Sequence, residues 1–267
     1  MTTFTSLHSV SIIGAGNVGS HLTKIFKQKG VQIDCVYSRS IRNAESLAKE
    51  VGTLAIDQFD LLPQESDLYV ICVPDDSIME VADKLFGVIP RKSIVAHTSG
   101  SRPLSDLAMF QNRAVFYPLQ TFSKGDTINF DEVPILIHTS KEELSFGVFD
   151  LAQKISSRVL QCDDELRGGI HLAAVLSCNF VNHLIYQAEE HLKRSEIDGE
   201  ILYPLIKKTI NKALNQSTFN AQTGPARRKD HETIKKHLQE LKYKPSLRKV
   251  YKWMSRSIIK TYSQIKD

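Results

Sequence analysis

The sequence has few cysteines and no long apolar run. None of its four cysteines lies in a CxxC pair or in a zinc-ligand spacing, and the positions are Cys35, Cys72, Cys162 and Cys178. We therefore expect reduced thiols, as in a cytoplasmic protein, and no metal site. The longest uninterrupted apolar stretch, near Leu172–Leu176, is far shorter than the roughly 20 residues that a bilayer requires. This criterion predicts no membrane span.

Positive charge is missing from the start of the chain, where the first Lys or Arg is Lys24. A secretory signal begins with a basic segment, so we expect none here. Overall, 34 Lys and Arg face 30 Asp and Glu in 267 residues, and 42% of residues are hydrophobic. These values exclude a mainly disordered chain, and the length permits a large core without disulfide or metal support.

The first half of the chain alternates strand-like and helix-like segments. Short apolar segments rich in β-branched residues occur at 8–14, 33–38, 67–73 and 93–96, and helix-period segments separate them. The run from Asp67 to Val73 is continuously apolar after its first residue, as in strands buried on both faces of a parallel sheet. We therefore predict an α/β fold with a doubly wound, mostly parallel sheet.

The pattern changes near residue 162. From residue 163 onward only helix-period segments occur, so we predict two domains: 1–162, which binds a dinucleotide, and 163–267, smaller and all-helical. The charge divides at the same place, with a net −3 in the first part and +7 in the second. This imbalance favours docking of the two domains and attraction of an anionic substrate.

A glycine-rich loop joins the first predicted strand to the first predicted helix. Its sequence fits GxGxxG and consists of Gly14, Ala15, Gly16, Asn17, Val18 and Gly19. In this context the three glycines permit a tight turn, close approach of a pyrophosphate and close helix packing, respectively. The N–H groups at the helix start would hold the phosphates. The loop predicts a dinucleotide site, and a glycine-rich turn without a ligand is the alternative.

The end of the second predicted strand indicates which dinucleotide binds. An NAD site carries Asp or Glu there, whereas this chain carries Ser38, Arg39 and Ser40. A guanidinium flanked by hydroxyls suits a 2′-phosphate, so NADP is favoured over NAD. The alternative is that Arg39 is a solvated loop residue.

Polar segments follow two further strands, where open α/β sheets bind their ligands. We predict that Val73, Pro74 and Asp75 line the dinucleotide, that Thr98 lies near its nicotinamide end, and that Ser99 orients a substrate. The alternative for both hydroxyls is loop capping.

Two polar residues of the long helix after residue 163 share one face. His171 and Asn179 lie eight residues apart, so both can project into one cleft between the domains. We predict that His171 is an acid/base catalyst and that Asn179 holds the substrate's carbonyl or imine group. A histidine buried in a core is the alternative. Arg228 follows a Gly-Pro turn and could pair with an acidic substrate; a plain interhelical loop is the alternative.

Nucleic acid and metal are not expected partners. The segment 227–260 carries 12 basic and 3 acidic residues with interspersed aromatics, a pattern that can bind phosphates but is more typical of a solvated face. No HExxH motif occurs.

Three segments resemble a known family. They are Phe116–Phe122 (FYPLQTF), the HLAAV of His171–Val175 with Asn179, and Thr223-Gly224-Pro225 leading to Arg228 and Asp230. Over nearly its full length the chain resembles bacterial Rossmann-like proteins with a DUF2520 carboxy-terminal domain. That family is similar to pyrroline-5-carboxylate reductase, F420-dependent NADP reductase and 6-phosphogluconate dehydrogenase. Many members of the wider group carry a catalytic Lys on the long helix, where this chain has His171.

The resemblance implies NAD(P) binding, an active site between a Rossmann domain and a helical domain, and dimerisation through the latter. Together with the residues above, it predicts a cytoplasmic, homodimeric NADP-dependent oxidoreductase. Such an enzyme transfers hydride to or from a carbonyl or imine carbon of a small, anionic substrate. The alternative is a non-catalytic NADP-binding sensor.

Overall fold

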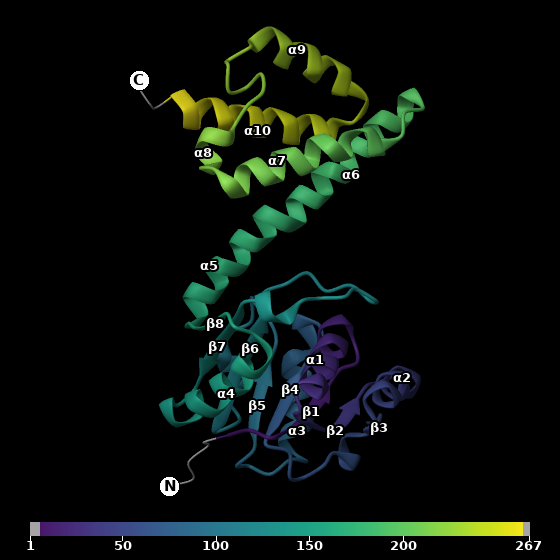
Figure 1. Cartoon of the computed structure of the whole chain (residues 1–267), viewed down its shortest axis with the longest axis vertical. Coiled ribbons are helices and arrows are strands. Elements are labelled where there is room, and N and C mark those ends of the chain that lie inside the picture. The colour runs from purple at the N-terminus through teal and green to yellow at the C-terminus, as the bar shows by residue number, and fades with distance from the viewer. Residues whose placement is uncertain (1–5, 264–267) are drawn as a thin grey trace. The chain divides into compact units, whose positions relative to one another are not determined.

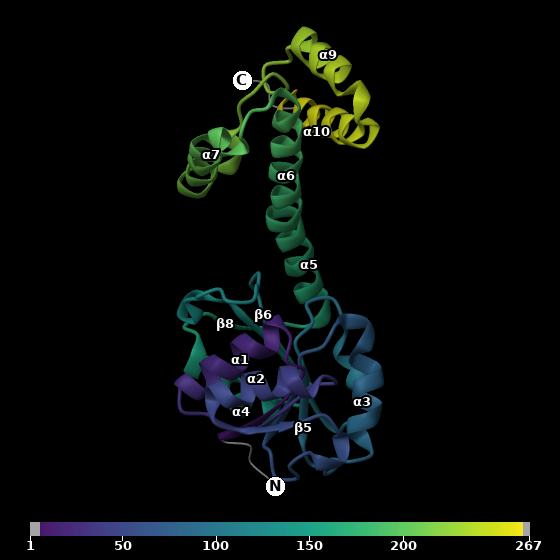
Figure 2. The same cartoon turned by 90° about the vertical axis from the view of Figure 1, so that its right-hand side faces the viewer.

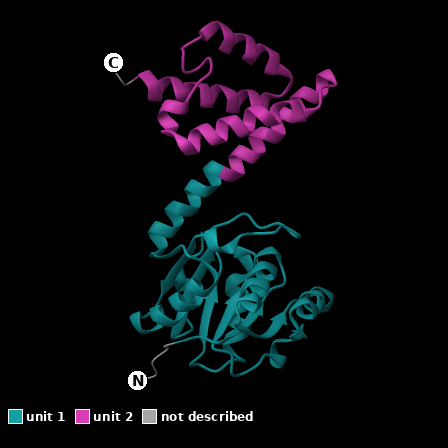
Figure 3. Ribbon diagram, in the orientation of Figure 1, with its two compact units in different colours: residues 1–177 teal, residues 178–267 magenta. Residues whose placement is uncertain are grey.

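The computed structural model describes residues 6–263, and its compact units are residues 1–177 and 178–267 (Figures 1 and 3). The outermost ends of both predicted domains, 1–5 and 264–267, therefore lie outside the described residues. The first unit is an eight-stranded sheet in the order β3-β2-β1-β4-β5-β6-β7-β8. Its strands are β1 (Ser9–Ile13), β2 (Gln32–Tyr37), β3 (Leu54–Ile56), β4 (Leu68–Ile71), β5 (Ile94–His97), β6 (Asn112–Pro118), β7 (Ile135–Thr139) and β8 (Val159–Gln161).

Helices cover both faces of this sheet. They are α1 (Asn17–Gln28), α2 (Ile41–Val51), α3 (Ile78–Phe86) and α4 (Glu142–Ile155), whereas α5 (Asp164–Ala174) leaves the sheet after β8. Figure 2 shows α1, α2 and α4 on one side of the sheet and α3 on the other. Every described strand pair is parallel except β6 and β7, so the predicted doubly wound, mostly parallel fold is confirmed.

The central strands are buried because their side chains alternate between two cores. In β4, Val70 packs into the core under α1 and α4, whereas Tyr69 and Ile71 pack into the core under α3. All four residues of β4 are buried, as its continuously apolar sequence predicts. This arrangement brings the carboxyl ends of β1, β2, β4, β5 and β6 to one edge of the sheet.

The second unit contains only helical elements among its described residues, 178–263. Its helices are α6 (Phe180–Leu192), α7 (Tyr203–Asn215), α8 (Thr218–Ala221), α9 (His231–Glu240) and α10 (Pro245–Ser263). Few of their side chains are buried, and large apolar ones such as Leu205, Leu214 and Trp253 are exposed. A unit of this size ordinarily buries an apolar core.

The change from strands to helices and the division into compact units fall at different places. β8 ends at Gln161 and α5 begins at Asp164, where Asp163 accepts a hydrogen bond from the Leu166 N–H. The compact units instead divide after Ser177. The first turns of α5 bond to the first unit, where Arg167 donates to the Arg102 carbonyl of the loop after β5 and His171 contacts Tyr117 of β6.

One helix has the length and composition of a membrane span. It runs from Asp164 to Ser195, with a mean hydropathy of 1.3 over its most apolar 18-residue window, and none of that window is buried. The count of uninterrupted apolar residues missed it, because single polar residues interrupt the segment. The test is weak evidence by itself, since core helices of water-soluble proteins also pass it.

Candidate functional site

The glycine loop has the geometry that its sequence predicts. Gly14 has φ +124°, and a Cβ added there would lie 2.4 Å from the Cys72 carbonyl oxygen. At Gly19 an added Cβ would lie 1.9 Å from the Gly14 carbonyl oxygen, so no side chain fits. At Gly16 it would meet nothing within 4 Å. Gly14 and Gly19 therefore shape the loop, whereas Gly16 presents bare backbone to open space.

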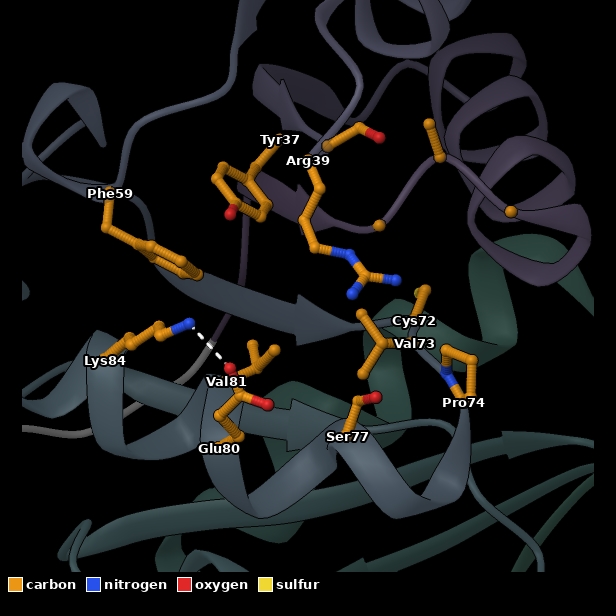
Figure 4. Close-up of a pocket in the computed structure, with 14 residues that line it drawn as sticks. Tyr37, Arg39, Phe59, Cys72, Val73, Pro74, Ser77, Glu80, Val81 and Lys84 are labelled. Carbon is orange, nitrogen blue, oxygen red and sulfur yellow. Dashed lines mark hydrogen bonds and ion pairs between the residues drawn. The ribbon is translucent and has the colours of Figure 1, made fainter.

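A cavity of about 210 Å³ opens beside this loop (Figure 4). It lies over the ends of β1, β2 and β4 and is bounded by α3. Seven predicted cofactor residues line it: Gly14, Ala15, Gly16, Ser38, Arg39, Val73 and Pro74. The Arg39 side chain reaches into the cavity in Figure 4. The residues fit a phosphorylated dinucleotide, because open space faces Gly16 and a guanidinium stands at the end of β2.

The other predicted cofactor residues are not among those that line the cavity. Asn17, Val18 and Gly19 belong to the first turn of α1, and the Asn17 side-chain amide donates to the Phe122 carbonyl (3.0 Å).

The Ser40 N–H donates to the Ser38 hydroxyl (3.3 Å). The Thr98 hydroxyl donates to the Ile71 carbonyl (3.3 Å), and Asp75 accepts from the Ser101 hydroxyl (2.5 Å). Their predicted contacts with the cofactor stay predictions.

Sequence reasoning missed the far wall of the cavity. Tyr37 and Phe59 form a ring pair there with centroids 4.3 Å apart. On α3, Lys84 and Glu80 form an ion pair of 2.7 Å at the rim. Burial raises the pKa of Tyr37, against the nearby charges of Lys84 and Arg39. The lining residues Ser77, Glu80, Val81 and Lys84 have helical spacing, so they fall on one face of α3 and the residue before it. That spacing is the sequence pattern that could have predicted this wall.

A second cluster joins β6 to α5. The Tyr117 hydroxyl lies 3.0 Å from Nδ1 of His171. Gly100, in the loop after β5, is wedged against both residues: an added Cβ would lie 2.6 Å from Nδ1 of His171 and 2.7 Å from Cζ of Tyr117. Burial raises the pKa of Tyr117. The contact forms either with the hydroxyl donating to Nδ1 or with an Nδ1–H donating to the hydroxyl oxygen, depending on the tautomer of His171. In the first arrangement the ring proton of a neutral His171 resides on Nε2.

The other predicted catalytic residues have different surroundings. The Ser99 hydroxyl is buried and accepts hydrogen bonds from the N–H groups of Ser101 (3.1 Å) and Arg102 (3.0 Å), as a loop cap does. Asn179 ends a π-helical turn, Val175–Asn179, and Arg228 lies in the turn before α9. Both belong to the second unit. Their convergence with His171 on a substrate stays a prediction.

Ionisable side chains cluster at the start of α5, before His171. Arg167 is 1% exposed, donates from Nη2 to the Arg102 carbonyl (2.5 Å) and pairs with Asp164 (2.8 Å). Asp164 also accepts from Nδ1 of His138 (2.9 Å) and from the Leu104 N–H (3.0 Å). Burial alone would raise the pKa of Asp164, but the hydrogen bonds from His138 and Arg167 outweigh it and lower the pKa. The described residues contain no group of three or more His, Cys, Asp or Glu that could hold a metal ion.

Two family models match the chain. The model "NADP oxidoreductase coenzyme F420-dependent" covers residues 9–100, and the model of the domain of unknown function DUF2520 covers residues 133–258. The first match contains the glycine loop and Arg39, and the second contains His171, Asn179 and Arg228.

Solved structures and curated proteins give further likenesses. A Bacteroides fragilis protein assigned as an NADP oxidoreductase is 34% identical, with a TM-score of 0.88 over 96% of this chain and 99% of that chain. An imine reductase from Myxococcus stipitatus, solved with NADP+, has a TM-score of 0.67 over 96% of this chain and 93% of that chain; at 15% identity this likeness shows the fold alone. Glucose-fructose oxidoreductase domain-containing protein 2 of Xenopus tropicalis is 24% identical over 69% of this chain, which spans half the length of that curated relative.

Proposed function

Because the chain belongs to the NADP oxidoreductase family that joins a Rossmann domain to a DUF2520 domain, we propose that it reduces a carbonyl or imine carbon of a small, anionic substrate with NADPH. The observation that carries the chemistry is the 3.0 Å contact between the Tyr117 hydroxyl and Nδ1 of His171. Tyr117 lies at the carboxyl end of β6, at the edge of the sheet where the glycine loop also lies. Ligands of open α/β sheets bind at that edge.

The cavity residues would hold the cofactor. The N–H groups at the start of α1 and the bare backbone of Gly16 suit its pyrophosphate, and Arg39 with Ser38 suits its 2′-phosphate. When bound, NADPH supplies a hydride to the substrate carbon.

The Tyr117–His171 pair would supply the proton that such a reduction needs. As the carbon is reduced, Nε2 of His171 gives its proton to the substrate oxygen or nitrogen, and the Tyr117 hydroxyl proton passes to Nδ1. Water then returns a proton to the phenolate. Asn179 and Arg228 of the second unit are proposed to supply the remaining contacts, to the reacting group and to the substrate's anionic group, in a cleft between the domains.

We also propose that the helical unit pairs with a second copy of the chain. Its exposed apolar side chains include Ile201, Leu205, Leu214 and Trp253. One unit by itself leaves these groups in water, at a cost of about 25 cal/mol per Å² of apolar surface. A homodimer covers them without any further protein.

Loss of NADPH absorbance at 340 nm, measured across a panel of keto acids with and without amines, tests the proposed reaction. We expect turnover with at least one carboxylate-bearing member. Tyr117→Phe and His171→Asn should bind NADPH as the unchanged protein does but turn over about 100-fold more slowly. Tight NADPH binding with no turnover across the panel would contradict the proposal and favour an NADP sensor.

A further inference from the structure

The side chain of Arg167 is buried with two of its nitrogens unpartnered. It is 1% exposed, and neither Nε nor Nη1 has a hydrogen-bond partner, although Nη2 donates to the Arg102 carbonyl. A buried charge whose donors are left unused is costly, and native proteins rarely retain one without a role. The reduction proposed above does not use Arg167. Its burial therefore calls for a separate explanation.

The contacts of Arg167 tie three segments together. Through the Arg102 carbonyl it holds the loop that follows β5. Through Asp164 it reaches the first turn of α5, and Asp164 in turn accepts from the Leu104 N–H of the same loop and from His138 of β7. The guanidinium and this carboxylate thus fix the start of α5 against the loop and the sheet.

The same loop and helix carry the Tyr117–His171 contact. Arg167 and His171 are four residues apart on α5, so they lie on one face of the helix one turn apart. Gly100 belongs to the loop that Arg167 holds, and its backbone leaves no room for a Cβ between itself and His171. A small slide of α5 along the loop would therefore separate Nδ1 from the Tyr117 hydroxyl.

We propose that Arg167 is the positioning residue of this site: by tying the first turn of α5 to the loop after β5, it keeps Nδ1 of His171 on the Tyr117 hydroxyl. The kinetic part of this inference rests on the function proposed above, but the positioning itself does not. The positive charge of Arg167 also opposes the rise that burial causes in the pKa of Tyr117.

The nitrogen NMR spectrum of the His171 ring tests the positioning without a substrate. The full-length chain is labelled and measured at pH 8, above the usual histidine pKa, and His171→Asn identifies the signals. We expect the unchanged protein to show a single tautomer with the proton on Nε2. Arg167→Met should give a mixture of tautomers, and Arg167→Lys should recover part of the single form.

Arg113→Met is the matched control. Arg113 also has a buried, unpartnered Nε, but it lies at the opposite end of β6 from Tyr117 and donates to the Phe110 carbonyl. Its loss should leave the His171 signals unchanged. Should Arg167→Met not fold, Asp164→Ala weakens the same tie, because it removes the carboxylate that pairs with Arg167 and accepts from the Leu104 N–H, and it should also produce a mixture. Unchanged His171 signals in the folded Arg167 or Asp164 variants would overturn the proposal.

Kinetics separate this inference from the proposed function. With any substrate found, Arg167→Met should lower kcat by about 10- to 100-fold at unchanged NADPH affinity, since small misplacements of a catalytic group cost this much. Unchanged kcat would overturn the positioning role. A chain that shows the tautomer change but turns over no substrate would refute the reductase proposal and leave the positioning role standing.

Discussion

Acid should destabilise the first unit through His97, the last residue of β5. Its side chain is fully buried, accepts from the Ser99 N–H at Nδ1 (3.2 Å) and lies 3.3 Å from the Pro103 carbonyl at Nε2. Burial, and then the charge of Arg167, lower its pKa from 6.5 to about 4, against the opposing charges of Asp106 and Asp164. The folded chain therefore keeps His97 neutral at pH values where the unfolded chain protonates it.

The sign and size of the effect follow from these two pKa values. Above pH 6.5 both states hold a neutral His97, so its contribution to stability is complete. As the pH falls from 6.5 to about 4, only the unfolded state gains the proton, and stability is lost. The gap corresponds to about 3 kcal/mol at 1.36 kcal/mol for each pH unit.

Urea unfolding at pH 7 and pH 4.5 measures this loss. His97→Gln removes the titrating group, so its stability should fall much less between the two pH values than that of the unchanged protein. His8→Gln, at an exposed histidine, should behave like the unchanged protein. The fluorescence of the single tryptophan, Trp253, follows the second unit, whereas circular dichroism follows both units. The part of the circular-dichroism change that does not coincide with the fluorescence transition therefore reports the first unit. Equal losses in His97→Gln and the unchanged protein would refute the reasoning.

Three further predictions concern the cofactor and the assembly. Gly19→Ala should lower the melting temperature strongly, because its Cβ overlaps the Gly14 carbonyl. Gly16→Ala should melt at the unchanged temperature but bind NADPH at least about 10-fold more weakly. Equal effects of the two variants on the melting temperature would contradict the assignment. Arg39→Gln should weaken NADPH binding about 10-fold and leave NADH binding nearly unchanged, and an unchanged ratio of the two affinities would refute the 2′-phosphate assignment. Light scattering at micromolar concentration should give twice the mass of one chain, and a monomer would contradict the proposed pairing.

The sequence predicts the features that depend on neighbouring residues. The GxGxxG loop, the buried β4 strand and the position of Arg39 at the end of β2 follow from local rules, and the structure has each of them. Helical spacing also places His171 and Asn179 on one helix, although a π-helical turn interrupts its regular period before Asn179. Rules of this kind need only a short window of the chain.

Features that depend on distant residues were beyond the sequence. Tyr117 and His171 are 54 residues apart, and neither segment contains a spacing pattern that predicts their contact. Helical spacing places Glu80 and Lys84 on one face of α3, but it does not tell that this face borders the glycine loop. Similarly, the position of Ser99 at a strand end is predictable, but its hydroxyl accepts from the backbone of the following residues. Position at an edge does not decide what a hydroxyl bonds.

For the exposed apolar residues of the long helix we propose a protein partner rather than lipid. Leu172, Leu176, Phe180 and Leu184 recur every four residues and are exposed, so they form one stripe along the helix. Asn179, Asn182, His183 and Gln187 interrupt the same segment, whereas a helix surrounded by hydrocarbon is apolar on all sides. A stripe with polar residues beside it matches the surface that one helix presents to another. A second copy of the chain carries the same stripe, and we propose that two copies cover one another's exposed leucines.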